Sequence, residues 1–469
     1  MKKKKRVNTE EFRRTLMFLL SLSILASLTA AFGYIWTHYL NAGVNWAFFK
    51  QGNRLLITFY FLLQYLLSRI YGALKIDLNK VSDIVYSQGL TTALVDFLMY
   101  FIMSLVARNM LRITPILILY MIQMGIIIIW AYISSFVYKC LYPPHRLIII
   151  YSSHSATNLL IKMAVREDQF HICESASIDQ GYDHIKERIM EYDGAIICDI
   201  SGSLRNDILK YCYEHDKRTY VIPKVSDIII RSGENIHLFD TPLLLCRNTG
   251  ITVDRRFFKR ILDILVALMG LIVTGWLMVI TAICIKAYDG GPVFFRQKRV
   301  TKDGKVFEII KFRSMIVDAE ADGKARPAVT DDERITPIGK VIRATRFDEM
   351  PQIFNVLKGD MSIVGPRPER VEHVEKYTKE FPEFQYRQKV KAGLTGYAQI
   401  YGKYNTTAYD KLKLDLFYIE NYSIRTDIRL IFQTVKVLFQ KESTEGFDKQ
   451  DKTKKLQTTG KESETEKTK

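Results

Sequence analysis

The chain has 469 residues, and its 67 Lys and Arg residues outnumber 50 Asp and Glu residues, which gives a formal net charge of +17. This length allows two or three domains, and the charge favours an anionic partner: nucleic acid, acidic lipid or nucleotide phosphate. The six cysteines include no CxxC pair, which argues against a structural zinc site and a disulfide framework.

The first part of the chain predicts a transmembrane bundle. A basic arm over residues 1–14 precedes four apolar runs, each close to the roughly 20 residues that a helix needs to cross a bilayer. These runs cover residues 16–36, 55–74, 84–107 and 113–137. Short loops join them, so we expect an α-helical bundle of four spans over residues 15–140. The lysine-rich arm should stay in the cytoplasm, and four crossings return the chain to that side. Four buried helices of a soluble protein are the alternative.

Residues 145–250 predict a soluble α/β domain. The strand-like runs "RLIIIYSS", "GAIICDIS" and "TYVIPK" alternate with the helix-like runs "ATNLLIKMAVRE" and "LRNDILKYCYEHDK". Such alternation favours a parallel, Rossmann-like sheet. The first strand is followed by "YSSHSATN", which lacks the glycines that a dinucleotide-binding turn needs. We therefore expect a structural or regulatory module, and a dinucleotide site is the alternative.

A fifth apolar segment, residues 261–285, determines the topology of everything that follows it. It is long enough to span, in which case the rest of the chain would lie on the far side of the membrane. Thr274 and Gly275 near its middle would allow the helix to bend. Charge on both flanks favours a segment that enters and leaves from the same face. We therefore expect a re-entrant membrane helix over residues 256–286, with a full span as the alternative. The flanking basic residues are Arg255, Arg256, Lys259, Arg260, Lys286, Arg296, Lys298 and Arg299.

Basic residues and glycine turns dominate residues 287–440. Lys311 and Arg313 end a predicted strand–turn–strand segment, and the stiff turn "GPRP" carries Arg367. Arginine binds phosphate through two parallel hydrogen bonds, and glycine turns let backbone N–H groups approach an anion. This segment therefore predicts a site for a phosphate ester, in particular a diphosphate. The tail, residues 441–469, is rich in Lys, Glu and Thr, and we expect it to be disordered.

An acid pair, Asp348 and Glu349, lies among these basic residues in "VIRATRFDEMPQIFNVL". One interpretation is a helix start, with Asp348 as the N-cap and with Glu349 and Pro351 in the first turn. The other is chemical, because a helix N-terminus and nearby arginines keep a carboxylate ionised, as a nucleophile on phosphorus requires. Neighbouring side chains in a helix point in different directions, so one acid could attack while the other holds a metal ion.

Six ordered motifs give the last part of the chain a specific resemblance. They are "KRILDI", "GPVFFRQKRV", "KVFEIIKFRSM", "DDERIT", "RFDEMPQIFNVLKGDMSIVGPRP" and "GLTGYAQIYGK". Together they resemble the bacterial sugar transferase family, the polyprenyl-phosphate hexose-1-phosphate transferases that initiate exopolysaccharide, capsule or O-antigen chains. The resemblance covers about residues 256–440. The apolar runs and the α/β domain are similar to the large polytopic branch of the family, with its degenerate nucleotide-fold domain.

The resemblance implies a membrane-associated α/β catalytic domain at the cytoplasmic face of the bacterial inner membrane. Asp348 matches the family's nucleophile, which attacks the β-phosphorus of a UDP-sugar, releases UMP and forms a sugar-phosphoryl aspartate. Polyprenyl (undecaprenyl) phosphate then attacks that intermediate. Glu349 matches the second acid, and the pair is implied to hold Mg²⁺. Arg343 and Arg367 match arginines that are associated with phosphate binding.

The remaining site residues are further expectations. We add Lys311 and Arg313 as phosphate ligands, with surface charges as the alternative. Lys259, Arg260 and Asp263 match the start of the family's re-entrant helix, and we expect a structural or lipid-facing role for them. Two departures from the family are visible. Thr274-Gly275 replaces a Ser-Pro break in the membrane hairpin, and Ala392 replaces the proline of a Pro-Gly-Leu-Thr-Gly turn.

The expected partners are a UDP-sugar, polyprenyl phosphate and the lipid bilayer, with a second copy in a homodimer as a further expectation. Nucleic acid is not expected, because the chain shows no helix-turn-helix and no motif of stacking aromatic residues. A membrane-anchored scaffold or regulator that binds a nucleotide sugar without chemistry is the alternative to an enzyme. Nothing in the sequence names the hexose.

Overall fold

The computed structural model describes residues 2–41, 50–152, 163, 170–247, 250–317, 319, 332–403 and 406–438. The chain forms two compact units, Met1–Ile222 and Pro223–Lys469, and each is described by itself. The tail predicted to be disordered lies outside the described residues, as does nearly all of the helix predicted over residues 156–167.

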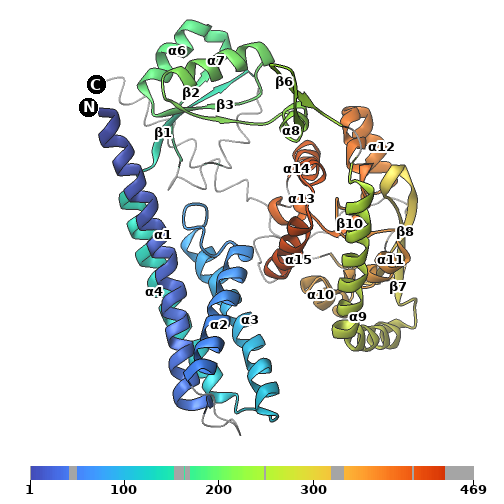
Figure 1. Ribbon diagram of the computed structural model, residues 1–469. Helices are drawn as coiled ribbons and strands as arrows, with labels where there is room; N and C mark the ends of the chain where they lie inside the picture. Colours follow the sequence, from blue (N-terminus) through green and yellow to red (C-terminus); the bar gives the residue numbers. More distant parts are fainter. Residues whose placement is uncertain are drawn as a thin grey trace. The chain divides into compact units, whose positions relative to one another are not determined.

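Long helices form the first part of the first unit (Figure 1). They are α1 (Lys2–Ile35, continued by a π-helical turn at Trp36–Leu40), α2 (Lys50–Tyr71), α3 (Val81–Ala107) and α4 (Thr114–Leu141). Among the described residues, four helices are long and apolar enough to cross a membrane: Glu11–Leu40, Val81–Ala107, Thr114–Leu141 and Val253–Asp289. The first, third and fourth predicted spans are therefore found. The second predicted span forms helix α2, which is not among these four, and the last of the four contains the fifth apolar segment.

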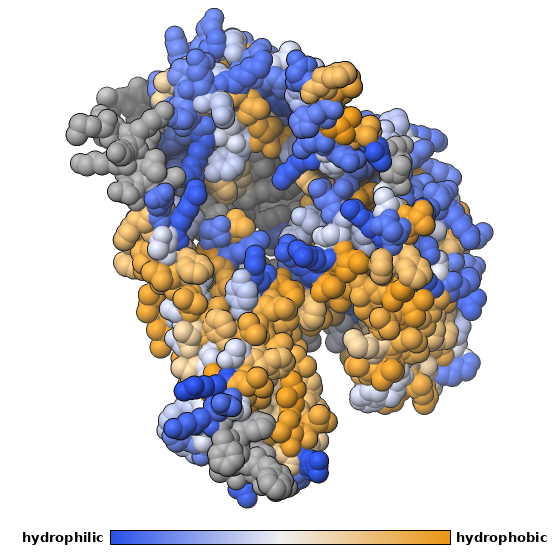
Figure 2. All heavy atoms as spheres, viewed as in Figure 1, coloured by the Kyte–Doolittle hydropathy of each residue, from blue (hydrophilic) through white to orange (hydrophobic). Residues whose placement is uncertain are grey.

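The helices of this bundle expose many large apolar side chains and bury several polar ones. On α3, Phe97, Phe101 and Leu105 are exposed, whereas Gln88 and Asp96 are buried. Figure 2 shows the resulting hydrophobic surface over α1 to α4. An apolar exterior of this kind is what a bilayer requires, because lipid offers no hydrogen bonds to polar groups.

A four-stranded parallel sheet forms the second part of the first unit (Figure 1). Its order is β2-β1-β3-β4, with β1 at His145–Tyr151, β2 at Phe170–Ser177, β3 at Gly194–Ile197 and β4 at Arg218–Val221. Helices α6 (Tyr182–Glu191) and α7 (Gly202–Glu214) bury Ile185, Ile189 and Ile208 against Ile148 and Ile150 of β1. The predicted parallel α/β sheet is confirmed, and strand β2 and helix α6 are additional to the elements expected from the sequence.

The second unit begins with α8 (Val225–Arg231) and an antiparallel hairpin, β5 (Glu234–Leu238) and β6 (Thr241–Leu245). These elements lie in the range that the sequence grouped with the parallel sheet, but they belong to the second compact unit. Helix α9 (Val253–Asp289) follows, and then the hairpin of β7 (Phe294–Val300) and β8 (Val306–Phe312), which confirms the predicted strand–turn–strand segment.

The rest of the second unit is mostly short helices around a small core. In chain order they are α10 (Pro337–Ala344), the 3₁₀ helix η6 (Phe347–Glu349), α11 (Gln352–Lys358), α12 (Val371–Glu380), the 3₁₀ helix η7 (Pro382–Lys389), α13 (Tyr397–Tyr401), α14 (Ala408–Glu420) and α15 (Ile424–Leu438). Strands β9 (Ser362–Val364) and β10 (Gly393–Thr395) pair in parallel. Leu412 and Leu416 of α14 pack in one core with Val356, Met361 and Val364.

The first half of α9 is built into this unit by buried polar contacts. Lys259 Nζ donates to Asp427 Oδ2 at 2.8 Å and to the carbonyl oxygen of Val364 at 2.9 Å. Asp263 accepts from Ser362 Oγ and from the backbone N–H of Ile363, each within 2.9 Å. Both Lys259 and Asp263 are buried. The expected structural role of these residues fits, and a lipid-facing position does not.

The second half of α9 packs against the same unit. Met278 and Ile285 bury themselves with Phe312 of β8 and Ile342 of α10. A straight helix of 37 residues would be about 55 Å long, but Figure 1 shows α9 as two segments at a marked angle. Thr274 Oγ1 donates to the carbonyl oxygen of Gly270 at 2.7 Å, a contact that often bends helices.

Candidate active site

The acid pair lies in the short 3₁₀ helix η6, between α10 and α11. Arg346 just before it has a φ of 54°, the left-handed region, which turns the chain sharply after α10. Phe347 stacks on Phe312 with an interplanar angle of 9° and anchors the turn. Asp348 therefore lies inside η6 and is not the N-cap of α11, because Pro351 takes that position without a side-chain cap. The helix-start interpretation of Asp348 is wrong.

Glu349 is the paired acid. Its Oε1 accepts from Lys311 Nζ at 2.7 Å and from Arg367 Nη2 at 2.9 Å. Burial alone would raise the pKa of Glu349, but the charges of Arg367 and Lys311 and their hydrogen bonds outweigh it and hold the pKa well below its usual range. Glu349 is therefore ionised at any physiological pH.

Asp348 has a different environment. Burial and the negative charge of Glu349 raise the pKa of Asp348, against the opposing charges of Lys311, Arg343 and Arg367. Two adjacent carboxylates with pKa values moved in opposite directions are a common arrangement where each acid has a separate chemical role. A poorly solvated carboxylate that keeps its lone pairs available is suited to nucleophilic attack.

Three of the predicted phosphate ligands surround the acids. Lys311 lies near the end of β8, Arg343 lies in the last turn of α10, and Arg367 is in the "GPRP" turn after β9. The Arg367 side chain is 45% exposed, so its remaining N–H groups are accessible to an anion. The structure thus brings Asp348, Glu349, Lys311, Arg343 and Arg367 together from four separate elements.

The fourth predicted ligand, Arg313, makes its ion pair elsewhere. Its guanidinium is 7% exposed and forms an ion pair with Asp289 at the C-terminal end of α9. This pair ties the end of α9 to the end of β8. Arg260 has a comparable docking role, since it donates to the carbonyl oxygens of Val356 and Leu357 in the last turn of α11. The other predicted residues of the membrane helix, Thr274 and Gly275, lie in the middle of α9, away from its two polar ends.

The turn that carries Arg367 is held by a full set of backbone contacts. The carbonyl oxygens of four consecutive residues, 366 to 369, each accept a hydrogen bond. The donors are the N–H of Gly393 at 2.9 Å, Arg387 Nη2 at 3.1 Å, Arg299 Nη1 at 3.1 Å and the N–H of Val300 at 3.2 Å, in that order. The sequence did not indicate Arg299 or Arg387 as site residues, although Arg299 lies within the motif "GPVFFRQKRV".

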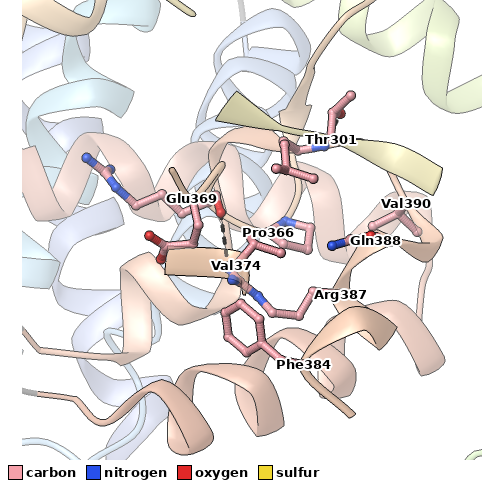
Figure 3. Close-up of a pocket in the computed structure, with 11 residues that line it drawn as sticks. Thr301, Pro366, Glu369, Val374, Phe384, Arg387, Gln388 and Val390 are labelled. Carbon is pink, nitrogen blue, oxygen red and sulfur yellow. Dashed lines mark hydrogen bonds between the residues drawn. The ribbon is translucent and has the colours of Figure 1, made fainter. Parts of the chain in front are cut away.

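A small pocket lies beside this turn, and Figure 3 shows Arg387 and Phe384 among the residues that line it. The Arg387 guanidinium lies over the Phe384 ring, 4.7 Å from its centroid. Arg387 Nε also forms a buried 2.7 Å ion pair with Asp415 of α14. Arg387 thus connects the turn of Arg367 to the core helix of the unit.

A divalent metal ion is compatible with the donors at the acid pair. No group of three or more His, Cys, Asp or Glu side chains in the described part of the chain could hold a metal ion. Mg²⁺, however, is commonly held by one or two carboxylates together with the phosphates of a substrate. Asp348 and Glu349 provide such a pair, so the residues fit a metal ion that binds with a diphosphate.

The two acids have pKa values shifted in opposite directions and are surrounded by Lys and Arg side chains. This arrangement defines a candidate phosphoryl-transfer site. Residues 254–441 match the bacterial sugar transferase family, and the chain belongs to that family.

Three relatives show the range of sugars in their names. The chain is 44% identical to a UDP-N-acetylgalactosamine-undecaprenyl-phosphate N-acetylgalactosaminephosphotransferase of Aeromonas hydrophila, over 51% of this chain and 56% of that protein. It is 43% identical to galactosyl transferase CpsE of Streptococcus agalactiae, over 40% and 45% respectively. It is 36% identical to a UDP-glucose:undecaprenyl-phosphate glucose-1-phosphate transferase of Caulobacter vibrioides, over 42% and 76%. The chain thus spans about half the length of the first two of these relatives.

Proposed function

We propose that this protein transfers a hexose-1-phosphate from a UDP-sugar to undecaprenyl phosphate, through a covalent sugar-phosphoryl intermediate on Asp348. The observation that carries the proposal is the asymmetry of the acid pair. Glu349 is neutralised by Lys311 and Arg367, whereas Asp348 is desolvated and available. The names of the relatives support the two substrate classes.

The first step forms one bond and breaks one bond. A carboxylate oxygen of Asp348 attacks the β-phosphorus, and the bond between that phosphorus and the bridging oxygen of the diphosphate breaks. UMP leaves with the electron pair. The guanidinium groups of Arg343 and Arg367 and the ammonium group of Lys311 neutralise charge on the phosphoryl oxygens, which is the main task of a phosphoryl-transfer site.

The second step restores the enzyme. A phosphate oxygen of undecaprenyl phosphate attacks the same phosphorus, the bond to Asp348 breaks, and the carboxylate is regenerated. Asp348 and Glu349 would hold Mg²⁺, which supplies further neutralisation of the diphosphate when it is bound.

The proposal includes a re-entrant α9, with the second unit at the cytoplasmic face of the bacterial inner membrane. Two contacts support it: the start of α9 is buried against β9 and α15 through Lys259, and its end is paired with Arg313 of the same unit. If α9 crossed the bilayer as one straight helix, one of these contacts could not form.

The topology can be tested by labelling single cysteines in a variant without native cysteines. Lys358 has a side chain that is 74% exposed, and Lys210 of the α/β domain is 79% exposed. An impermeant thiol reagent added to right-side-out membranes should label neither K358C nor K210C, and should label both after permeabilisation. Labelling of K358C alone in intact membranes would refute the re-entrant helix.

The reaction can be tested with a panel of radiolabelled UDP-sugars and membranes that contain the full chain. An enzyme releases UMP and transfers label to lipid, and the panel identifies the hexose. Binding of a UDP-sugar without UMP release would instead indicate a non-catalytic scaffold.

A further inference from the structure

A ladder of polar side chains lies between α2 and α3 inside the first unit. Tyr60 OH donates to Asp96 Oδ1 at 3.2 Å, Gln64 Nε2 to Thr92 Oγ1 at 2.9 Å, and Ser68 Oγ to Gln88 Oε1 at 3.5 Å. Each step of four residues forward on α2 matches a step of four residues backward on α3. Side chains four apart share one helix face, so the three pairs form a continuous row, which we call the polar ladder.

The other helices of the bundle close the polar ladder from outside. From α4, Gln123 Nε2 donates to Tyr60 OH at 2.8 Å. From α1, Phe32 stacks on the Tyr60 ring with the centroids 4.1 Å apart. The six ladder residues and Gln123 are at most 2% exposed. The polar ladder is therefore sealed inside helices whose outer faces are apolar.

Several hydrogen-bonding atoms of this cluster have no partner. They are Asp96 Oδ2, Gln64 Oε1, Gln123 Oε1 and Gln88 Nε2, all fully buried in the described structure. A buried polar atom without a partner costs about 1–3 kcal/mol. Internal water is the usual remedy, since one buried water typically makes about three hydrogen bonds to such atoms.

Asp96 lies near the middle of α3, and no cation among the described residues forms an ion pair with it. The described groups that face it are Tyr60 from α2 and Gln123 from α4, with Tyr120 of α4 close enough to interact with its charge. Phe32 of α1 adds an apolar ring behind Tyr60. An ionised carboxylate without a basic partner is strongly disfavoured at the centre of a membrane bundle.

We propose that the polar ladder is a proton-binding site, in which Asp96 is held as a neutral carboxylic acid and internal water joins it to the amide oxygens of Gln64 and Gln123. The hydrogen bonds determine which oxygen carries the proton. Tyr60 OH accepts from Gln123 and donates to Oδ1, so Oδ1 is an acceptor and Oδ2 carries the proton. The Oδ2–H group then donates a hydrogen bond to internal water and keeps its proton. The inference concerns the first unit alone and does not depend on the transfer reaction.

The test is infrared spectroscopy of the full chain in lipid nanodiscs, which detects the carbonyl band of a protonated carboxylic acid. At neutral pH the wild type should show this band, and D96N should lack it. D83N, which removes an acid at the start of the same helix, should keep it. Identical spectra of the wild type and D96N would overturn the proposal.

Two further measurements keep the proposal testable if D96N fails to insert. Y60F keeps the acid but removes the hydrogen bond to Oδ1, so the Asp96 band should persist and shift; an unshifted band would contradict the assigned geometry. Addition of Na⁺ at constant pH should leave the band unchanged. Loss of the band with Na⁺ would identify the site as a cation site and overturn the assignment to a proton.

Discussion

Arg387 donates a hydrogen bond from Nη2 to the carbonyl oxygen of Arg367, 3.1 Å away, while its Nε pairs with Asp415 at 2.7 Å. Arg367 in turn donates to Glu349. A chain of contacts therefore runs from the core helix α14 to the acid pair, and it passes through the backbone of the residue that binds the acid. Arg387 acts in this way as a positioning residue.

Replacement of Arg387 by lysine should lower kcat more than it raises KM. Lysine keeps the charge but lacks the planar fork that reaches both Asp415 and the turn. Loss of a hydrogen bond to a charged group costs about 1.5–3 kcal/mol, which corresponds to a fall of roughly 10- to 150-fold. Steady-state UMP release gives both constants.

The matched control is K389Q. Lys389 lies in the same 3₁₀ helix as Arg387, but its side chain pairs with Glu420 of α14. The two variants should lose comparable thermal stability, while only R387K loses kcat. If R387K and K389Q had equal kcat values at equal thermal stability, Arg387 would not be a positioning residue.

Substitution of the two acids should separate their roles. D348N should lower the rate of UMP release by roughly 10⁴-fold or more, as loss of a nucleophile does in well-studied enzymes. E349Q should keep a measurable rate, because Asp348 remains. Mass spectrometry of peptides from a quenched reaction should find a sugar-phosphoryl adduct on Asp348 in E349Q and the wild type. An adduct on Glu349, or turnover by D348N, would contradict the assignment.

The pH profile should report Asp348. Its raised pKa means that the reactive, ionised form is lost as pH falls through a value above the ordinary one of about 3.9. The acid limb of kcat/KM should therefore lie at higher pH than for a free aspartate. R343Q removes a charge that lowers this pKa, so the limb should move to still higher pH. K358Q, which changes an exposed lysine, should leave the limb in place, and a limb unmoved in R343Q would place Arg343 away from Asp348.

The acid pair also affects stability, with opposite signs. The depressed pKa of Glu349 contributes stability above its unfolded pKa, and this contribution is lost as pH falls through the folded value. The raised pKa of Asp348 acts the other way, since the folded state resists its ionisation as pH rises. Thermal unfolding should therefore show E349Q to be less pH-sensitive on the acid side than the wild type. An unchanged acid-side slope in E349Q would mean that the Lys311 and Arg367 contacts do not depress this pKa.

Arg313 can be distinguished from a phosphate ligand by comparing it with Lys311. The Arg313 side chain is buried and pairs with Asp289 at the end of α9, so R313M should lower the unfolding temperature and leave KM for the UDP-sugar nearly unchanged. K311M should raise KM. A large rise in KM for R313M without loss of stability would instead support the expectation from the sequence that Arg313 binds phosphate.

These two residues also illustrate what the sequence could and could not predict. Lys311 and Arg313 are two positions apart, so a strand would place both on one face. Strand β8 ends at Phe312, however, and Arg313 donates its N–H to Val293 and its side chain to Asp289. The acid pair and its arginines were predictable because residue type and turn chemistry are local. The Arg387–Asp415 pair joins residues 28 apart and has no local signal.

In the membrane segments, too, local features could be predicted from the sequence and contacts between distant residues could not. Apolar length was enough to find α1, α3, α4 and α9. The polar ladder could not be foreseen, because Gln64 or Ser68 alone is an ordinary interruption of an apolar run, and its partner on α3 becomes known only from the fold. Strand β2 was missed since "FHICESAS" mixes polar and apolar residues without a long apolar run.

Asp263 of α9 accepts hydrogen bonds from Ser362 Oγ and from the N–H of Ile363, and Ala267 of α9 is buried in the core of the second unit. Helix α9 is therefore an internal part of that unit as well as an anchor. Deleting the helix to obtain a water-soluble fragment would open the interior and leave a serine and a backbone amide without an acceptor. A trimmed version for crystallisation should therefore retain α9 and be handled in detergent from the outset.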